Sequence, residues 1–189
     1  MTLRILLLLS LMAASGIGQE NLHSLALSHL KSGQPEEALT TLAPLLEENP
    51  DAQTYELQGR AMFQLNDMNG ALAALDQSIG LEPERSSAHF HVGEIFFRQQ
   101  RWSEALGAFS YSLELSPDDK APILKMVYCL VAMENYPVAH KWITTLDPTN
   151  DLDPDYYFAR ASMAMATGKM QEYNNVLRQA RTIYSTEVF

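Results

Sequence analysis

The feature that most constrains the fold of this chain is a repeat of about 34 residues. Alanines recur at spacings of 33, 34 and 34 residues, at Ala38, Ala71, Ala105 and Ala139. Twelve residues after the first three of them stand prolines, at Pro50, Pro83 and Pro117. Twelve residues before the four alanines stand small or slim residues, Ala26, Gly59, Gly93 and Val127. Because these landmarks share one period, we expect repeated structural units rather than one irregular domain.

A fifth, divergent unit is expected at the carboxyl end. One more period lands on Tyr173, which breaks the alanine rule, whereas neighbours such as Ala161 and Gly168 keep their spacings. The predicted units cover about residues 19–51, 52–85, 86–119, 120–153 and 154–184, and residues 185–189 form a C-terminal tail. Together the units make one repeat domain over residues 19–184.

Each unit has the apolar period of two helices joined by a turn. In the third unit, apolar residues at helical steps precede and follow the polar break at Gln99–Arg101. Small residues such as Gly59 are expected to let the two helices of a hairpin approach closely. Pro35, Ser103 and Asn135 stand where second helices should start, and Pro44 is expected to kink or shorten its helix. The predicted fold class is therefore all-α.

The first eighteen residues differ from the rest. A short basic start is followed by an apolar run over 5–14 and by small residues at 14–18. We interpret residues 1–18 as a signal peptide ending at Ser15 or Gly18, and the alternative is an uncleaved membrane anchor. The expected location is therefore exported, periplasmic or secreted, with membrane contact only through this segment if it is retained.

Charge and cysteine content narrow the function further. The chain has 13 Lys and Arg against 23 Asp and Glu, a net charge of −10, and no basic run that would attract a phosphate backbone. Nucleic-acid binding is not expected. The single cysteine, Cys129, cannot form an intrachain disulfide, so a packed apolar core must hold the fold.

The repeat resembles the tetratricopeptide repeat family over residues 19–184. The third unit carries most of the family signature as Val92–Gly93, Phe96, Trp102, Ala105, Phe109 and Pro117. The resemblance implies a right-handed superhelical solenoid of about five repeats, whose first helices line a concave groove. It also implies that the chain holds peptides or partner proteins rather than catalysing a reaction. The clamp of Lys, Asn and Arg by which chaperone-binding members hold a peptide carboxylate is absent here.

Counting one helical turn from the packing positions gives a set of predicted groove residues, rich in apolar side chains. They are Leu27, Leu30, Arg60, Phe63, Phe90, Glu94, Phe97, Arg98, Leu124, Tyr128, Val131, Phe158 and Met165. A contiguous apolar strip predicts a cover such as an amphipathic helix, which Arg60, Glu94 and Arg98 would orient. The alternative is that these side chains pack against neighbouring units or mediate self-association.

No residue pattern in the sequence indicates a catalytic site or a metal site. His89 and His91 are about 200° apart around a helix, so they cannot bind one metal ion, and the same holds for His23 and His29. Cys129 is expected to be a buried small hydrophobic residue. We therefore predict no enzyme activity, no cofactor and no metal site.

Together these observations predict a non-enzymatic scaffold or adaptor that binds a peptide or helix of a partner protein in an apolar concave groove. The alternative function is a self-associating structural subunit of a larger envelope assembly, such as a homodimer formed through its end units.

Overall fold

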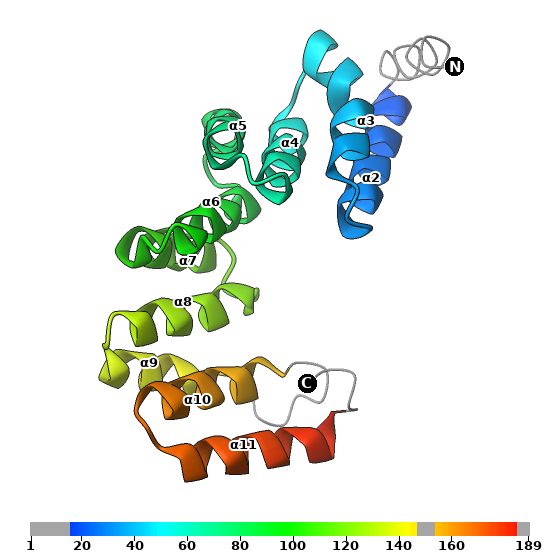
Figure 1. The fold of residues 1–189 in the computed structure, drawn as a ribbon. Coiled ribbons are helices and arrows are strands. Elements are labelled where there is room, and N and C mark those ends of the chain that lie inside the picture. The colour runs from blue at the N-terminus through cyan, green and yellow to red at the C-terminus, as the bar shows by residue number, and fades with distance from the viewer. Residues whose placement is uncertain (1–15, 147–153, 185–189) are drawn as a thin grey trace. The chain divides into compact units, whose positions relative to one another are not determined.

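The computed structural model describes residues 16–146 and 154–184, and its regular structure over these residues is entirely helical (Figure 1). The all-α prediction is confirmed. The helices are α2 (Gly16–Lys31), α3 (Pro35–Glu48), α4 (Ala52–Gln64), α5 (Met68–Leu81), α6 (Ser86–Arg98), α7 (Trp102–Leu115), α8 (Ala121–Ala132), α9 (Tyr136–Ile143), α10 (Asp155–Ala166) and α11 (Met170–Ile183).

The predicted signal segment and the tail fall almost wholly outside the described residues. Residues 1–15 and 185–189 are not described, and residues 16–18 belong to α2. Among the helices that are described, none is both long and apolar enough to cross a membrane.

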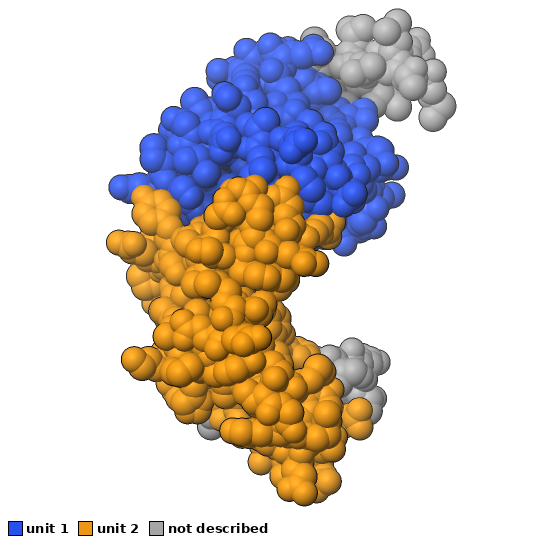
Figure 2. Space-filling model, turned by 60° about the vertical axis from the view of Figure 1, so that its left-hand side comes forward, with its two compact units in different colours: residues 1–95 blue, residues 96–189 orange. Residues whose placement is uncertain are grey.

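The chain divides into two compact units, residues 1–95 and residues 96–189 (Figure 2). The division falls inside α6. In unit 1, α2 packs against α3, α3 against α4 and α4 against α5. In unit 2, α7 packs against α8, α8 against α9 and α10 against α11. First helices of successive hairpins also touch, since α2 contacts α4 and α8 contacts α10. This is the neighbour-to-neighbour packing of stacked helical hairpins.

The small residues of the period lie where helices come closest. Ala26, Ala38 and Ala139 are fully buried. A Cβ atom placed on Gly59 of α4 would lie 2.8 Å from Cγ of Leu75 and 3.1 Å from the carbonyl oxygen of Ala71, both on α5. The close approach predicted at Gly59 is therefore confirmed, because no side chain fits between these helices without a shift.

The period is also present in the backbone of the turns inside the hairpins. Residues with positive φ angles stand 33, 34, 34 and 34 residues apart, at Gly33, Asn66, Gln100, Glu134 and Gly168. The N–H group that follows each of them donates to the carbonyl five residues earlier, as from Gln34 to His29 at 2.9 Å and from Lys169 to Ala164 at 2.9 Å. Every hairpin thus ends its first helix with the same left-handed cap, the divergent fifth one included.

Two expectations about helix boundaries were wrong, namely the shortening of α3 at Pro44 and the capping of α7 by Ser103, whereas a kink at Pro44 stays a prediction. Pro44 lies inside α3, yet this helix has 14 residues, as α5 and α7 do, so it is not shortened. Pro44 is buried among the apolar residues of α3, and this packing outweighs the loss of one backbone hydrogen bond. Helix α7 begins at Trp102, so Ser103 lies within its first turn and does not cap it. Pro35 does occupy the first position of α3.

Candidate functional site

The predicted groove residues all belong to the first helices of the hairpins. We call the surface from α2, α4 and the part of α6 up to Ile95 the first-helix face of unit 1. The first-helix face of unit 2 consists of residues 96–98 together with α8 and α10. Each face is described separately.

On unit 1, most predicted groove residues are half-buried. Leu27 and Phe63 pack against the two cores of this unit, and the Phe90 ring meets His91 edge to face with centroids 5.6 Å apart. Leu30 differs, because it is 3% exposed and belongs to the core that α2 forms with α3. Leu30 is therefore a packing residue and no part of an accessible face.

A cluster of charged residues centres on Glu56 of α4. Its side chain is 6% exposed and accepts hydrogen bonds from Nε of Arg85 at 2.5 Å and from Oγ of Ser87 at 2.7 Å. Nη1 of Arg60 lies 3.9 Å from the same carboxylate. His91 Nε2 lies 3.8 Å from it, and this cluster therefore joins α4 to the start of α6.

The guanidinium of Arg85 is held in this cluster by two carboxylates. Burial would lower the pKa of Arg85, but hydrogen bonds to Glu56 and Glu82 outweigh burial and raise it. Glu94, a predicted groove residue, lies 3.0 Å from Nδ1 of His91. The polar groups of this face thus satisfy one another, as a buried carboxylate requires.

His23 of α2 contacts α4, the next first helix of unit 1. Its ring is 4% exposed, and Nε2 lies 2.8 Å from Oγ1 of Thr54. Oγ1 of Thr54 donates to the carboxylate of Asp51 at 2.8 Å, so it accepts its other hydrogen bond from Nε2–H of His23. Burial lowers the pKa of His23, and the nearby Asp51 only partly opposes this. His23 is therefore a neutral structural donor.

On unit 2, aromatic rings replace the charged cluster. The ring of Phe97 is 5.1 Å from that of Trp102, at 73° to it, and 6.5 Å from that of Tyr128. Nζ of Lys125 lies 5.7 Å from the centroid of Phe97. These contacts join the end of α6 to α7 and α8, so Phe97 serves partly as a packing residue.

The remaining residues of this face range from half-buried to exposed. Leu124 and Val131 pack against the core formed by α8, α9 and α10, Phe158 is half-buried, and Arg98 is exposed. Met165 is 54% exposed.

Tyr128 lies at the contact between two first helices of unit 2. Burial raises the pKa of Tyr128, and the charge of Asp155 at the start of α10 raises it further. The phenol and this carboxylate therefore place polar groups among the apolar side chains of the face.

The titratable residues considered for catalysis or metal binding are buried or hydrogen-bonded within the chain. Cys129 is fully buried, and burial raises the pKa of its thiol to about 11, which confirms the expected small hydrophobic residue. Within residues 16–146 and 154–184, His, Cys, Asp and Glu side chains form no group of three that could hold a metal ion. A ring nitrogen of His29 forms a hydrogen bond with the side chain of Gln34. A ring nitrogen of His89 donates a hydrogen bond to the carbonyl oxygen of Pro83.

Family comparison decides what kind of repeat this is. Residues 23–79 and 57–120 match the family model described as tetratricopeptide repeat, in two overlapping stretches that span more than half of the chain. The chain belongs to the tetratricopeptide repeat family. Repeats of this family generally serve as scaffolds for protein interactions.

Individual tetratricopeptide repeat proteins resemble the chain, in sequence over part of its length and in structure over most of it. Tetratricopeptide repeat protein 16 of Macaca fascicularis is 28% identical over 116 residues, which are 58% of this chain and only 13% of that protein. The structure of TTC0263, a thermophilic tetratricopeptide repeat protein of Thermus thermophilus, gives a TM-score of 0.74 at 16% identity, covering 89% of this chain and 93% of that one.

A chain of the APC/C hetero-tetramer Cut9–Hcn1 gives a TM-score of 0.73 at 18% identity, covering 84% of this chain and 30% of that one. At such identities the structural matches establish the fold.

Sequence reasoning missed the pairing of Glu56 with Arg85. Glu56 stands three residues before Gly59, on the side of α4 that packs against other helices. This position is the sequence feature that indicates a buried carboxylate. A carboxylate at such a position requires a cation or several donors nearby. The partner lies 29 residues away, in a turn that the repeat pattern leaves variable, so spacing alone did not identify it.

Proposed function

We propose that this protein is a non-enzymatic scaffold that binds a helix or peptide of a partner protein on its first-helix faces. The observation that carries the proposal is the first-helix face of unit 2. There Tyr128 and Phe158 are partly exposed, and Met165 is 54% exposed. Covering such side chains stabilises a complex by about 25 cal/mol for each Å² of apolar surface removed from water.

The charged residues of this face would set the orientation of a bound segment. Arg98 is exposed, and Lys125 lies over Phe97 at one side of the face. Asp155 stands at the start of α10, beside Tyr128. An amphipathic helix with apolar anchors at helical steps and a few charged residues has the chemistry to match. Tetratricopeptide repeat family membership supports the same class of function.

Site-specific photo-crosslinking tests the proposal. A photoreactive phenylalanine analogue is placed in turn at Phe158 and at Met165, and as a control at Tyr111, which is 42% exposed on the second helix α7. We expect the first two positions to crosslink to the same segment of one partner protein, identified by mass spectrometry, and Tyr111 to give no such product. Equal crosslinking at all three positions, or none at Phe158 and Met165, would contradict the proposal.

The alternative function, a self-associating structural subunit, predicts crosslinks between two copies of the chain. Sedimentation measurements at high protein concentration separate the two functions, because a monomer contradicts the structural subunit. Met170 and Ile183 are exposed apolar residues at the two ends of α11, and the exposed residues between them are polar.

We also infer that the protein is exported to the periplasm or secreted. The support is the pattern of residues 1–18, which has the basic start, apolar run and small-residue exit of a signal peptide. N-terminal sequencing of the protein isolated from its natural host tests this inference. A chain that starts after Ser15 or Gly18 is expected, and an intact Met1 in the cytoplasmic fraction would overturn it.

A further inference from the structure

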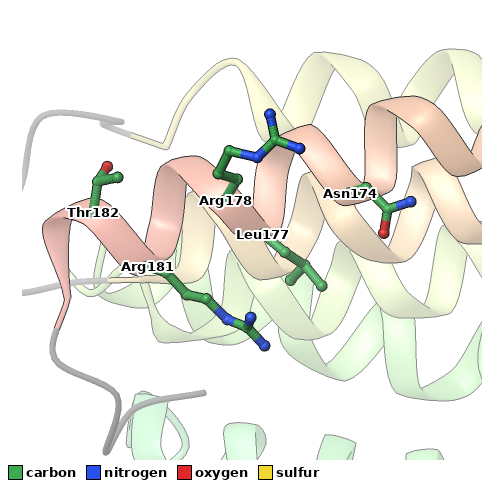
Figure 3. Close-up of a pocket in the computed structure, with 5 residues that line it drawn as sticks. All are labelled: Asn174, Leu177, Arg178, Arg181 and Thr182. Atoms are coloured by element: carbon green, nitrogen blue, oxygen red, sulfur yellow. The ribbon is translucent and has the colours of Figure 1, made fainter.

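The outward surface of α11 carries two arginines beside a surface pocket. This pocket has a volume of about 500 Å³, and the described residues that line it are Asn174, Leu177, Arg178, Arg181 and Thr182 (Figure 3). Leu177 is half-buried, and the others are exposed. The lining of the pocket thus combines one half-buried apolar side chain with four exposed polar ones.

The charges of these two arginines are not neutralised by the part of the chain that the structure describes. Elsewhere in unit 2, Arg101 forms an ion pair with Glu104, and Arg160 with Glu172. Neither Arg178 nor Arg181 pairs with a carboxylate among residues 16–146 and 154–184. In a chain with 23 acidic against 13 basic residues, two neighbouring cations without such a partner form a local positive patch.

The spacing of these residues makes the pocket a groove between two rows of side chains. Asn174, Arg178 and Thr182 follow one another at steps of four residues, and Leu177 and Arg181 form the adjacent row. Figure 3 shows the guanidinium groups of Arg178 and Arg181 extending to opposite sides of the helix. A ridge of side chains from another helix fits between such rows. A carboxylate on either side of that ridge would face one of the two guanidinium groups.

We propose that α11 is a second docking surface, which binds an acidic helical segment of a partner protein through Arg178 and Arg181. Each guanidinium would donate charge-assisted hydrogen bonds to a carboxylate, and Asn174 and Thr182 would add neutral ones. A phosphate backbone or an anionic membrane is the weaker match, because the net charge of −10 would repel a large anionic surface. This surface belongs to a second helix and is separate from the first-helix faces.

Peptide binding to the full chain tests the proposal. The probe is a fluorescein-labelled helical peptide with glutamate at every fourth position, and its partner probe has glutamine at the same positions. Fluorescence anisotropy is expected to show binding of the glutamate peptide only, weakening as salt is added. The variant Arg178→Gln/Arg181→Gln should bind at least about tenfold more weakly, since two charge-assisted contacts are lost.

A matched control removes two other positive charges from unit 2. Lys120 and Lys141 are exposed, and Lys120→Gln/Lys141→Gln changes the net charge by the same amount as the arginine variant. This control should bind the glutamate peptide as the unaltered chain does. Circular dichroism should show equal helix content in all variants, because none of the four side chains is buried.

Several results would overturn the proposal. One is equal binding of both peptides, another is failure of the unaltered chain to bind the glutamate peptide, and a third is equal weakening in both double variants. Binding of phosphatidylglycerol vesicles but not of the peptide would assign the arginines to a membrane surface instead. Dimerisation that disappears in the arginine variant would assign them to a contact between copies.

Discussion

The first-helix faces of the two units are built from the same kind of helix but stabilised by different chemistry. In unit 1, the buried carboxylate of Glu56 binds Arg85 and Ser87 across the gap between α4 and α6. In unit 2, Phe97 packs between Trp102 and Tyr128, with Lys125 above its ring. The same hairpin backbone thus accommodates either a charged cluster or an aromatic cluster between its helices, provided that apolar area is covered and polar groups are paired.

This difference has consequences for how each unit responds to mutation and to solution conditions. A buried ion pair fails when one partner is removed, because the other charge is left in a poorly solvated place. An aromatic cluster loses contact area and leaves a gap, and its strength does not depend on proton binding or on salt screening.

The largest effect is expected from Glu56→Gln in unit 1. This change leaves Arg85 without its buried partner and should reduce local stability by about 3 kcal/mol. Hydrogen exchange of the amides in α4 and α6 measures the effect unit by unit, which global unfolding of a stacked repeat protein does not. Glu104→Gln removes an exposed ion pair in unit 2 and should change exchange little. Equal protection in both variants would show that the buried cluster is not the main contact.

A somewhat smaller loss is expected from Phe97→Leu in unit 2. The ring contacts with Trp102 and Tyr128 disappear, at a cost of about 1.5 kcal/mol for the aromatic pairs and lost area. Exchange in α7 and α8 of this variant should accelerate, whereas the amides of α4 in unit 1 should keep their protection. If α4 loses as much protection as α7 and α8, the distinction between the two kinds of face is wrong.

Opposite signs are expected from two glycine substitutions. Gly59→Ala forces a Cβ to within 2.8 Å of Leu75, so it should destabilise unit 1 by about 1–2 kcal/mol. Gly107 lies on an open part of α7, and Gly107→Ala should stabilise unit 2 by about 0.5–1 kcal/mol through helix propensity. Thermal melting followed by circular dichroism checks both signs. A stabilising Gly59→Ala would mean that α4 and α5 separate at little cost.

The smallest effect concerns pH and the buried His23. Because burial holds its folded pKa below the unfolded value of 6.5, His23 takes up a proton more readily in the unfolded chain. Its contribution to stability is complete above pH 6.5 and is lost as pH falls from there toward the folded pKa. The variant His23→Gln keeps an N–H donor for Thr54 without titrating, so its α2 amides should lose less protection on acidification. An identical pH profile in both proteins would assign the acid response to other groups.

The architecture could be predicted from the sequence because its signals are local and repeated. The alanine period, the helical steps of apolar residues and the glycine at position 59 each follow from sterics that act between chain neighbours. The placement of Cys129 in a core followed from its position in an apolar helix. The left-handed turn positions shared the same period, but residues as different as Gly33, Gln100 and Glu134 occupy them, so no residue type revealed them.

The sequence by itself thus determined that helical hairpins repeat and which of their helices face one another. Only the tertiary structure decided which side chains of the predicted face remain accessible. In the structure Leu30 lies in the core, Glu56 pairs with Arg85, and Phe97 packs against Trp102. The physical reason is that exposure and pairing depend on residues distant in the chain meeting in space, which a spacing rule within one helix does not encode.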